Sequence, residues 1–309
     1  MTTLVETQEL TKRYGSSRGI EDVTFEINEG EVFGFLGPNG AGKTTTIRTL
    51  MGLLRPTAGS AHIGGLDCWE QSTDVKRLVG YLPGELSLDP NLTGGQILEY
   101  FGNLRGGVDQ SYLKALIERM GLDPTRKFRQ YSSGNKRKIG IVQAFMHRPR
   151  LLILDEPTNG LDPLNQQEFD RMVREVRDEG RTVFLSSHIL GEVEQTCTRV
   201  AIIREGQLAH IGEVAALKDI KRHDVTITFA GDVPLEAFKA LPGVDQAEAL
   251  ADGHSLRLAV SGGLDGVIKT AAQHPVVNLT SQEPSLEEIF LRYYEDDGAV
   301  AREASHVVP

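Results

Sequence analysis

The sequence has little cysteine and no long hydrophobic run. Cys68 and Cys197 are its two cysteines among 309 residues, and they form no Cys-X-X-Cys pair. Thiols so far apart are typical of a reducing compartment and disfavour a disulfide framework or a cysteine-based metal site. No stretch reaches the roughly 18 consecutive apolar residues that a membrane-spanning helix needs. We therefore expect a chain that does not itself cross a membrane.

Basic charge is also scarce relative to acidic charge. The 33 lysines and arginines against 43 aspartates and glutamates give a formal net charge of -10. This balance disfavours a broad surface for anionic lipid or nucleic acid, so no nucleic-acid partner is expected and any nucleotide must be held locally. Glu6 and Glu9 stand where a secretory signal would carry positive charge, which favours a cytoplasmic location.

What the sequence does contain is an α/β pattern. Residues 4–30 alternate like strands of an antiparallel sheet, and 32–36 reads as a short buried strand that leads through a glycine-rich turn into a helix over 43–51. Two more buried strands flank an amphipathic helix, which predicts a right-handed parallel crossover. These strands are 151–154 and 182–186, and the helix is 163–178. The expected fold class is α/β, with an antiparallel N-terminal sheet.

A mostly helical stretch, about residues 88–145, separates the first buried strand from the second. Its apolar side chains keep helical spacing, and we interpret them as core rather than as cofactor contacts. They are Ile97, Tyr100, Phe101, Leu104, Leu113, Leu116, Ile117 and Met120. This spacing predicts a helical subdomain inserted into a larger domain that spans residues 1–222.

The pattern changes after about Arg222. Extended and helical segments follow in the order βαββαβ, with a last helix over 284–294, which predicts a small ferredoxin-like α+β accessory domain over 223–297. The final residues, 298–309, have little to bury and are expected to be mobile.

A glycine-rich loop is the first motif that carries chemistry. It fits the pattern G-x-x-x-x-G-K-[ST] between a buried strand and a helix, which is the context that a phosphate-binding loop requires. Its residues are Gly37, Pro38, Asn39, Gly40, Ala41, Gly42, Lys43, Thr44 and Thr45. The glycines allow successive N–H groups to converge, and Lys43 supplies a full charge for the β- and γ-phosphates. The hydroxyl of Thr44 is predicted to bind Mg²⁺.

Asp155 and Glu156 follow the buried strand 151–154. This is the edge at which open α/β sheets bind ligands, and neighbouring side chains on a strand point in different directions. We expect Asp155 to hold Mg²⁺, directly or through water, and Glu156 to polarise the attacking water. Two acids after an apolar strand could also mark a strand end that meets a helix cap, but the upstream phosphate loop favours the catalytic interpretation.

The residues between these motifs distinguish among nucleotide enzymes. Tyr131, Ser132, Ser133, Gly134 and Asn135 precede a helix, and this segment resembles the signature motif of ATP-binding-cassette (ABC) ATPases, whose common form is LSGGQ. Three of the five positions differ, but Ser132 and Gly134 are kept. A hydroxyl and backbone N–H groups at a helix start form an anion site. The resemblance implies that this site faces ATP held by a second subunit.

Further segments match the same family in order. Tyr14 is similar to the aromatic residue that stacks on adenine, Asp162 belongs to a segment similar to the loop that crosses the dimer interface, and His188 is similar to the switch histidine. A lone tyrosine or histidine is more often structural, but the ordered placement favours function here. The resemblance implies that His188 contacts the γ-phosphate and orients Glu156 and its water, while Asp162 supports the opposing site.

One position departs from the family pattern. Gly84 stands where the family usually carries a glutamine that reaches Mg²⁺ and the membrane partner. Glycine has no side chain to bind a metal, so either Glu85 replaces the glutamine or water completes the metal shell.

The resemblance covers about residues 4–220, and 284–290 resembles the closing helix of ATP-binding subunits of bacterial multidrug and antibiotic exporters. The resemblance implies that ATP and Mg²⁺ are bound between this chain and a second copy of it or a homologous cassette. It also implies a location at the cytoplasmic face of the membrane, where ATP hydrolysis powers drug or antibiotic export through a separate transmembrane permease. Alternatives are lipid or polysaccharide export, a nucleotide-gated binding module, and a soluble ABC ATPase acting on ribosomes or DNA. Relatives of that last kind usually carry paired cassettes or a long coiled-coil insertion.

Overall fold

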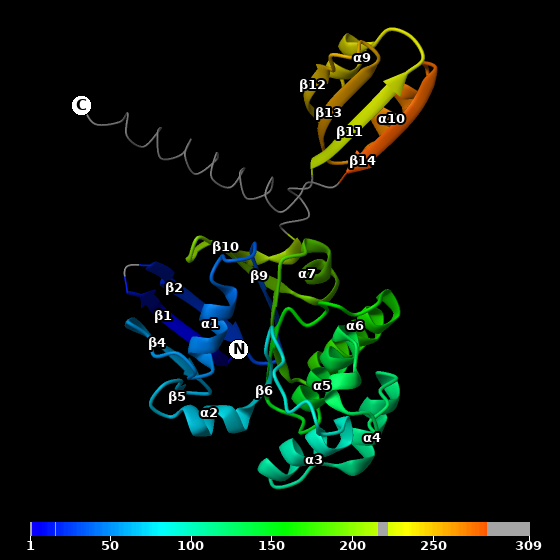
Figure 1. Cartoon of the computed structure of the whole chain (residues 1–309). Helices are drawn as coiled ribbons and strands as arrows, with labels where there is room; N and C mark the ends of the chain where they lie inside the picture. The colour runs from blue at the N-terminus through cyan, green and yellow to red at the C-terminus, as the bar shows by residue number, and fades with distance from the viewer. Residues whose placement is uncertain (1, 16, 216–221, 283–309) are drawn as a thin grey trace, which may run out of the picture. The chain divides into compact units, whose positions relative to one another are not determined.

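The structure is a computed structural model that describes residues 2–15, 17–215 and 222–282 (Figure 1). Residue contacts divide the chain into a first unit, Met1–Val214, and a second unit, Ala215–Pro309. The helix expected over 284–294 and the tail 298–309 lie outside the described residues. Within the described part of the chain, no helix combines the length and the apolar character that crossing a bilayer requires.

The first unit begins with an antiparallel sheet in the strand order β2-β1-β4-β5. Its strands are β1 (Thr3–Tyr14), β2 (Ser17–Asn28), β4 (Ala58–Ile63) and β5 (Leu66–Asp67). Strand β1 pairs antiparallel with both β2 and β4. The antiparallel N-terminal sheet expected over 4–30 is therefore present, and a strand pair that follows the phosphate loop extends it.

The second sheet carries the phosphate loop, and its order is β10-β9-β3-β8-β7-β6. Its strands are β3 (Val32–Leu36), β6 (Val79–Leu82), β7 (Leu151–Asp155), β8 (Thr182–Ser187), β9 (Arg199–Arg204) and β10 (Gln207–Glu213). Strands β9, β3, β8, β7 and β6 run parallel, and β10 adds an antiparallel edge. Every residue of β3, β7 and β8 is buried, as expected for a parallel sheet with both faces covered.

Four phenylalanine rings join the two sheets. Phe25 of β2 lies 5.6 Å from the rings of both Phe33 and Phe35 of β3, measured between centroids. Its centroid is 5.9 Å from that of Phe184 on β8. Aromatic pairs at such distances stabilise beyond the area that they bury. The cluster fixes β3, and with it the start of the phosphate loop, against the antiparallel sheet.

The helices of the first unit lie around the parallel sheet and in a group beside it (Figure 1). They are α1 (Lys43–Leu50), α2 (Ser72–Leu78), α3 (Gly94–Leu104), α4 (Gln110–Arg119), η1 (Phe128–Gln130), α5 (Ser133–Phe145), α6 (Pro163–Asp178) and α7 (Leu190–Thr196). Helices α3 and α4 each pack on α5 in the stretch for which an inserted helical subdomain is expected.

Two of the residues interpreted as core of the helical stretch lie at the surface, so that prediction was wrong for them. Tyr100 is 56% exposed and Leu104 is 65% exposed. Helix α3 instead buries Ile97, Leu98 and Gly102, a face rotated from the one that the apolar spacing indicates. Periodicity locates an apolar stripe but does not decide which part of it meets the core, because that depends on the neighbouring helices.

The second unit contains the segments expected for a βαββαβ order. They are β11 (Arg222–Phe229), α9 (Leu235–Lys239), β12 (Val244–Ala249), β13 (Ser255–Ser261), α10 (Asp265–Ala271) and β14 (Val276–Gln282). The sheet order is β12-β13-β11-β14, and every pair is antiparallel. Val225, Ile227, Phe238, Leu258 and Val267 belong to a separate hydrophobic core. This unit therefore has a core of its own.

Candidate nucleotide-binding site

The phosphate loop connects β3 to α1, and its glycines make its path possible. Gly40 has φ 80° and Gly42 has φ 115°, values that L side chains rarely adopt. A Cβ on Gly42 would also lie 2.8 Å from Cγ2 of Ile20. Gly42 is the N-cap of α1, so the unpaired N–H groups at the start of this helix face the loop. The local geometry is that of an anion-binding concavity.

Lys43 is only 5% exposed, and its ammonium is held from three directions. Its Nζ donates to the carbonyl oxygens of Gly37 at 2.6 Å and Pro38 at 3.2 Å. The same Nζ lies 3.1 Å from Oε1 of Glu156. A buried charge so arranged keeps a fixed position beside the loop, which suits it to contact phosphate oxygens.

Asp155 and Thr44 bring two oxygen donors together beneath the loop. The hydroxyl of Thr44 donates to Oδ2 of Asp155 at 2.8 Å, and the hydroxyl of Ser186 donates to Oδ1 at 2.7 Å. Asp155 is fully buried at the end of β7, and Ser186 lies on the neighbouring strand β8. A hydroxyl and a carboxylate are ligands that Mg²⁺ prefers, so this pair fits the metal.

The backbone of Glu156 turns away from the strand. Its φ is 49°, in the left-handed region that costs a non-glycine residue free energy. Its N–H is fixed by the carbonyl of Ser186 at 3.2 Å and by the hydroxyl of Ser186 at 3.0 Å. This turn sends the carboxylate of Glu156 toward Lys43, whereas that of Asp155 meets Thr44, so the two acids occupy different environments.

Charged and polar side chains surround the carboxylate of Glu156. Oε2 lies 3.3 Å from Nδ1 of His188 and accepts a hydrogen bond from the side chain of Asn159. Burial alone would raise the pKa of Glu156, but Lys43 above all, then Asn159 and His188, hold this pKa below its usual value. Glu156 is therefore ionised at neutral pH, the state needed to polarise a water molecule.

Tyr14 and the loop share one pocket. It is lined by Tyr14, Gly19, Pro38, Asn39, Gly40, Gly42, Lys43, Thr44, Thr45 and Glu156. Tyr14 is 46% exposed, and Nζ of Lys12 lies 5.6 Å from the centroid of its ring, so a base that stacks on this ring would lie close to the Lys12 ammonium. A Cβ on Gly19 would lie 2.9 Å from Cε2 of that ring, so glycine is needed for this approach. Gly19 was not predicted, because a single glycine in a strand has many explanations.

The signature segment lies outside the residues that line this pocket, within the part of the chain that the structure describes. Ser132 is the N-cap of α5, and its Oγ accepts from the N–H of Asn135 at 3.3 Å. Ser132 and Ser133 are exposed. A Cβ on Gly134 would lie 2.5 Å from the carbonyl oxygen of Gly160, so the segment packs closely on the loop before Asp162.

Among the described residues, we observe no contact of Asp162 or Glu85 with the residues that line the nucleotide pocket. Asp162 caps α6 by accepting from the N–H of Asn165 at 3.0 Å. Glu85 is exposed. Beside it, a Cβ on Gly84 would lie 3.1 Å from Oδ2 of Asp155, so the missing glutamine position is directly next to the predicted metal ligand.

Arg137 was not singled out from the sequence, yet it is central to the site. It is 5% exposed, and its guanidinium donates to the backbone carbonyl oxygens of five residues. These are Pro83, Gly84, Asp155, Glu156 and Pro157. The run Lys136-Arg137-Lys138 suggests a solvated helix face, and only the packing of α5 shows that its middle residue points inward.

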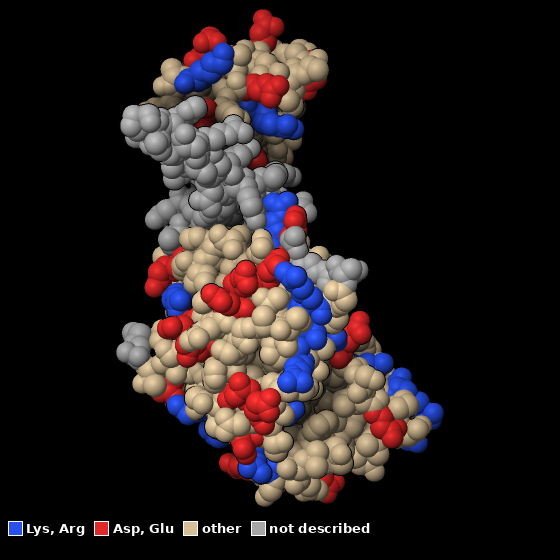
Figure 2. All heavy atoms as spheres, turned by 90° about the vertical axis from the view of Figure 1, so that its left-hand side faces the viewer, with Lys and Arg blue, Asp and Glu red and all other residues tan. Residues whose placement is uncertain are grey.

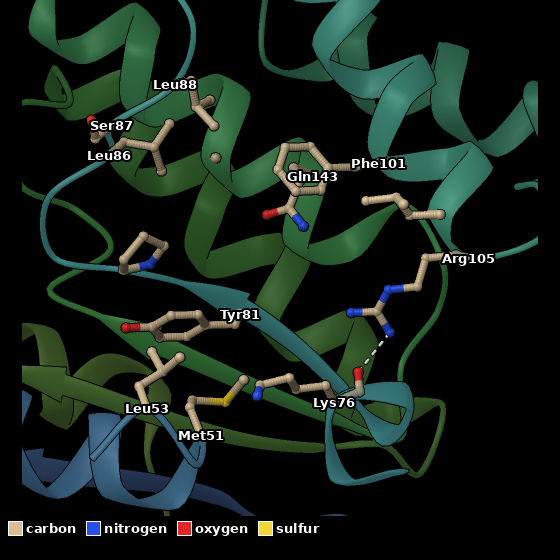
Figure 3. A pocket seen from close by; sticks show the side chains of 13 residues that line it. Met51, Leu53, Lys76, Tyr81, Leu86, Ser87, Leu88, Phe101, Arg105 and Gln143 are labelled. Atoms are coloured by element: carbon tan, nitrogen blue, oxygen red, sulfur yellow. Dashed lines mark hydrogen bonds between the residues drawn. The ribbon is translucent and has the colours of Figure 1, made fainter. Parts of the chain in front are cut away.

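An apolar groove opens beside the segment that contains Pro83 and Leu86 (Figure 3). Its cavity of about 350 Å³ lies between α1, β6 and the helices α3 and α5. We call it the apolar groove; its lining is Met51, Leu53, Lys76, Tyr81, Pro83, Leu86, Ser87, Leu88, Phe101, Leu104, Arg105, Gly140 and Gln143. On its rim, Nη1 of Arg105 donates to the carbonyl of Lys76 at 2.8 Å.

Charge is mixed at the surface. Figure 2 shows acidic and basic side chains interspersed over the face that it draws, without a broad basic field there. This agrees with the formal net charge of -10.

The chain resembles known proteins over most of its length. The family model described as "ABC transporter" matches residues 20–159. The bacitracin transport ATP-binding protein BcrA of Bacillus licheniformis is 40% identical over 211 residues, which cover 67% of this chain and 69% of that protein. The linearmycin resistance ATP-binding protein LnrL of Bacillus subtilis (strain 168) is 31% identical over 306 residues, covering 93% and 97%.

Solved structures share the fold. An ATP-binding subunit of an ABC transporter superposes with a TM-score of 0.65 at 31% identity, over 70% of this chain and 92% of that one. The dimeric cassette MJ0796 has a TM-score of 0.63 at 20% identity, which supports the fold alone. Because two relatives are 40% and 31% identical and are covered over 69% and 97% of their length, the chain belongs to the ABC transporter family and is an ATP-binding, ATP-hydrolysing subunit of such a transporter.

Proposed function

We propose that this subunit powers the export of antibiotics or other drugs through a separate transmembrane partner. The observation that carries the proposal is the carboxylate of Glu156, which is ionised and lies between Lys43 and His188 beside the phosphate loop. The drug class is supported by relatives whose names refer to bacitracin transport, linearmycin resistance and multidrug transport.

Each side chain near the phosphate loop has a role in ATP binding or hydrolysis that suits its surroundings. The loop N–H groups and Lys43 bind the phosphates, Tyr14 stacks on adenine, and Glu156 accepts a hydrogen bond from the attacking water. His188 orients Glu156 through the 3.3 Å contact to its Oε2. Thr44 and Asp155 would hold Mg²⁺, which neutralises phosphate charge when bound. The donors are fixed before the reaction, so little reorganisation is needed.

The catalytic site is completed by a second cassette. The signature segment does not line the pocket of its own chain, and Ser132 and Ser133 are exposed at the start of α5. Gly134 and Asn135, which follow them, are half-buried. We propose that this segment contacts the γ-phosphate of ATP held by the other copy, and that Asp162 supports the opposing site. Nucleotide then forms part of the interface, and hydrolysis separates the halves.

The apolar groove receives the transmembrane partner. Leu53, Phe101 and Leu104 supply apolar surface, and Leu53 and Leu104 are 52% and 65% exposed. Exposed apolar side chains gathered at a groove favour docking of a short apolar helix. This arrangement places the subunit at the cytoplasmic face of the membrane, attached through its partner rather than inserted.

The test is drug sensitivity in the native cells. Cells that lack this chain are complemented with the parent protein or with Glu156→Gln, and growth inhibition and intracellular accumulation are measured for a panel that includes bacitracin. The proposal predicts that the parent protein restores resistance to at least one antibiotic and that the variant does not. Equal sensitivity of all strains to every antibiotic in the panel, with lipid composition altered instead, would overturn the drug class.

A further inference from the structure

Arg137 hydrogen-bonds to two segments that lie far apart in the sequence: one lines the apolar groove, and the other carries Glu156. Its Nη1 donates to the carbonyls of Pro83 at 2.7 Å and Gly84 at 3.0 Å, which begin the loop that lines the apolar groove. Its Nη2 donates to the carbonyls of Asp155 and Glu156, and its Nε donates to that of Pro157 at 3.2 Å. We call residues 83–88 the groove loop. One planar guanidinium thus binds both the groove loop and the backbone of residues 155–157.

The rigidity of the guanidinium makes this arrangement a mechanical link. Its donors lie in one plane at fixed angles, and hydrogen bonds weaken steeply when that geometry is lost. A shift of the loop at Pro83 and Gly84 therefore changes the bonds to Glu156. Glu156 is sensitive to such a change because its φ of 49° is a strained conformation, fixed at the N–H by Ser186 and at the carbonyl by Arg137.

Gly84 has no side chain that could contact the reaction centre directly, as the glutamine usual at this position would. The hydrogen bonds that link the groove loop to Arg137 come from the backbone carbonyls of Pro83 and Gly84. Arg137 is buried and does not belong to the residues that line the nucleotide pocket in the described part of the chain. Its side chain therefore acts on the reaction through the backbone of Glu156.

We propose that Arg137 is a positioning residue that couples the groove loop to Glu156, so that movement at the apolar groove sets the position of the catalytic carboxylate. The proposal rests on the proposed function only in taking the apolar groove as the docking site of the transmembrane partner. The link between loop and carboxylate is tested on the chain itself, without that partner.

The test uses a fluorescent reporter on the loop. Ser87 is exposed, so Ser87→Cys can be labelled. The natural thiols interfere little, because burial raises the pKa of Cys68 and of Cys197 to about 12. The reporter signal is followed as a non-hydrolysable ATP analogue is added to the parent, to Arg137→Lys, and to Arg171→Lys. Arg171 is an exposed arginine of α6 and serves as the matched control.

We expect Arg137→Lys to bind nucleotide with unchanged affinity, measured by calorimetry, and to lose the reporter response. Its kcat should fall about ten-fold, the size expected from losing a charge-assisted hydrogen bond. Arg171→Lys should match the parent. A full reporter response in Arg137→Lys, or a loss of nucleotide affinity as large as its loss of kcat, would overturn the proposal.

Hydrogen exchange keeps the proposal testable if Arg137→Lys does not fold. In the parent chain, nucleotide should change the exchange of residues 84–88 together with that of 155–159. If the loop does not respond while the catalytic segment does, the two are not coupled. These outcomes do not depend on which substrate is exported, so a failed drug test would leave them intact.

Discussion

Glu156 illustrates how single residues in this chain are shaped by their neighbours. Its backbone is held in a left-handed conformation between Ser186 and Arg137, and its carboxylate lies between Lys43 and His188. Ser186 and Arg137 fix the direction in which the carboxylate points, and Lys43 above all, then Asn159 and His188, hold its pKa below the usual value against the effect of burial.

Replacing Glu156 by Gln keeps the shape of the side chain but removes its charge. We expect ATP binding and melting temperature to remain, and kcat to fall by roughly 10² or more, the usual scale for a positioned base. Phosphate release and nucleotide binding measure the two effects separately. Glu175→Gln, at an exposed ion pair with Arg119, is the control. Normal hydrolysis by Glu156→Gln would show that another group activates the water.

Lys43 should control binding instead. Removing its ammonium in Lys43→Ala takes away a buried charge-assisted contact, which is expected to weaken nucleotide binding by roughly 10- to 100-fold. Lys114→Ala, at a residue whose side chain is 77% exposed, should leave binding unchanged. Titration with a fluorescent ATP analogue distinguishes the two variants, and equal affinities would remove Lys43 from the phosphate site.

Among the elements, those with strong local signals were well predicted from the sequence. The strand 32–36 and the helix 163–178 have the expected bounds. The helix is marked by Asp162 at the N-cap and Pro163 at its first position, and both signals are local. The phosphate loop was placed for the same reason, since its glycines and flanking elements are adjacent in the chain.

Features that depend on packing between distant segments were not predictable in this way. Arg137 points inward because Pro83 and Pro157 approach it from two different loops. The hydroxyl of Ser186 reaches Asp155 only because β7 and β8 are neighbours in the sheet. Tyr100 and Leu104 face outward because α3 is oriented by its neighbours. A sequence pattern fixes the period of an element, whereas its rotation is set by the whole core.

The contact between α6 and α7 makes a pH-dependent contribution to stability. Burial raises the pKa of Asp170 on α6 from 3.8 to about 6, while Arg174 lowers it and Glu192 on α7 raises it. Because this pKa is higher in the folded state, the group's stabilising contribution is complete below about pH 4 and is lost as pH rises through about 6. Ionised Asp170 therefore destabilises the fold at neutral pH.

Asp170→Asn should remove that cost. We expect its free energy of unfolding to exceed that of the parent by about 1–3 kcal/mol at pH 8, from roughly two units of pKa difference. The advantage should shrink as pH falls through 6 and vanish near 4. Urea denaturation at several pH values measures it, with the exposed Asp178→Asn as control. A pH-independent difference would exclude titration of Asp170 as the cause.

For the whole molecule, the proposed transport function requires a partner that occupies the apolar groove. Leu104→Glu places a charge on a groove residue that is already 65% exposed, so folding should be unaffected. Recovery of a membrane protein with the tagged chain should fall at least several-fold, because a charge in a docked interface is left without a partner. Ile268→Glu, on the 52% exposed Ile268 of the second unit, is the control. If both variants recover the partner equally, docking occurs elsewhere.

A role in transport is tested most directly by purifying the tagged chain from its native membranes and assaying the ATPase activity of the isolated complex with and without Glu156→Gln. If the chain powers a transporter, a polytopic membrane protein is recovered with it and hydrolysis depends on Glu156. Recovery of ribosomes, nucleic acid or no partner at all would contradict a role in transport and would leave only the nucleotide chemistry in place.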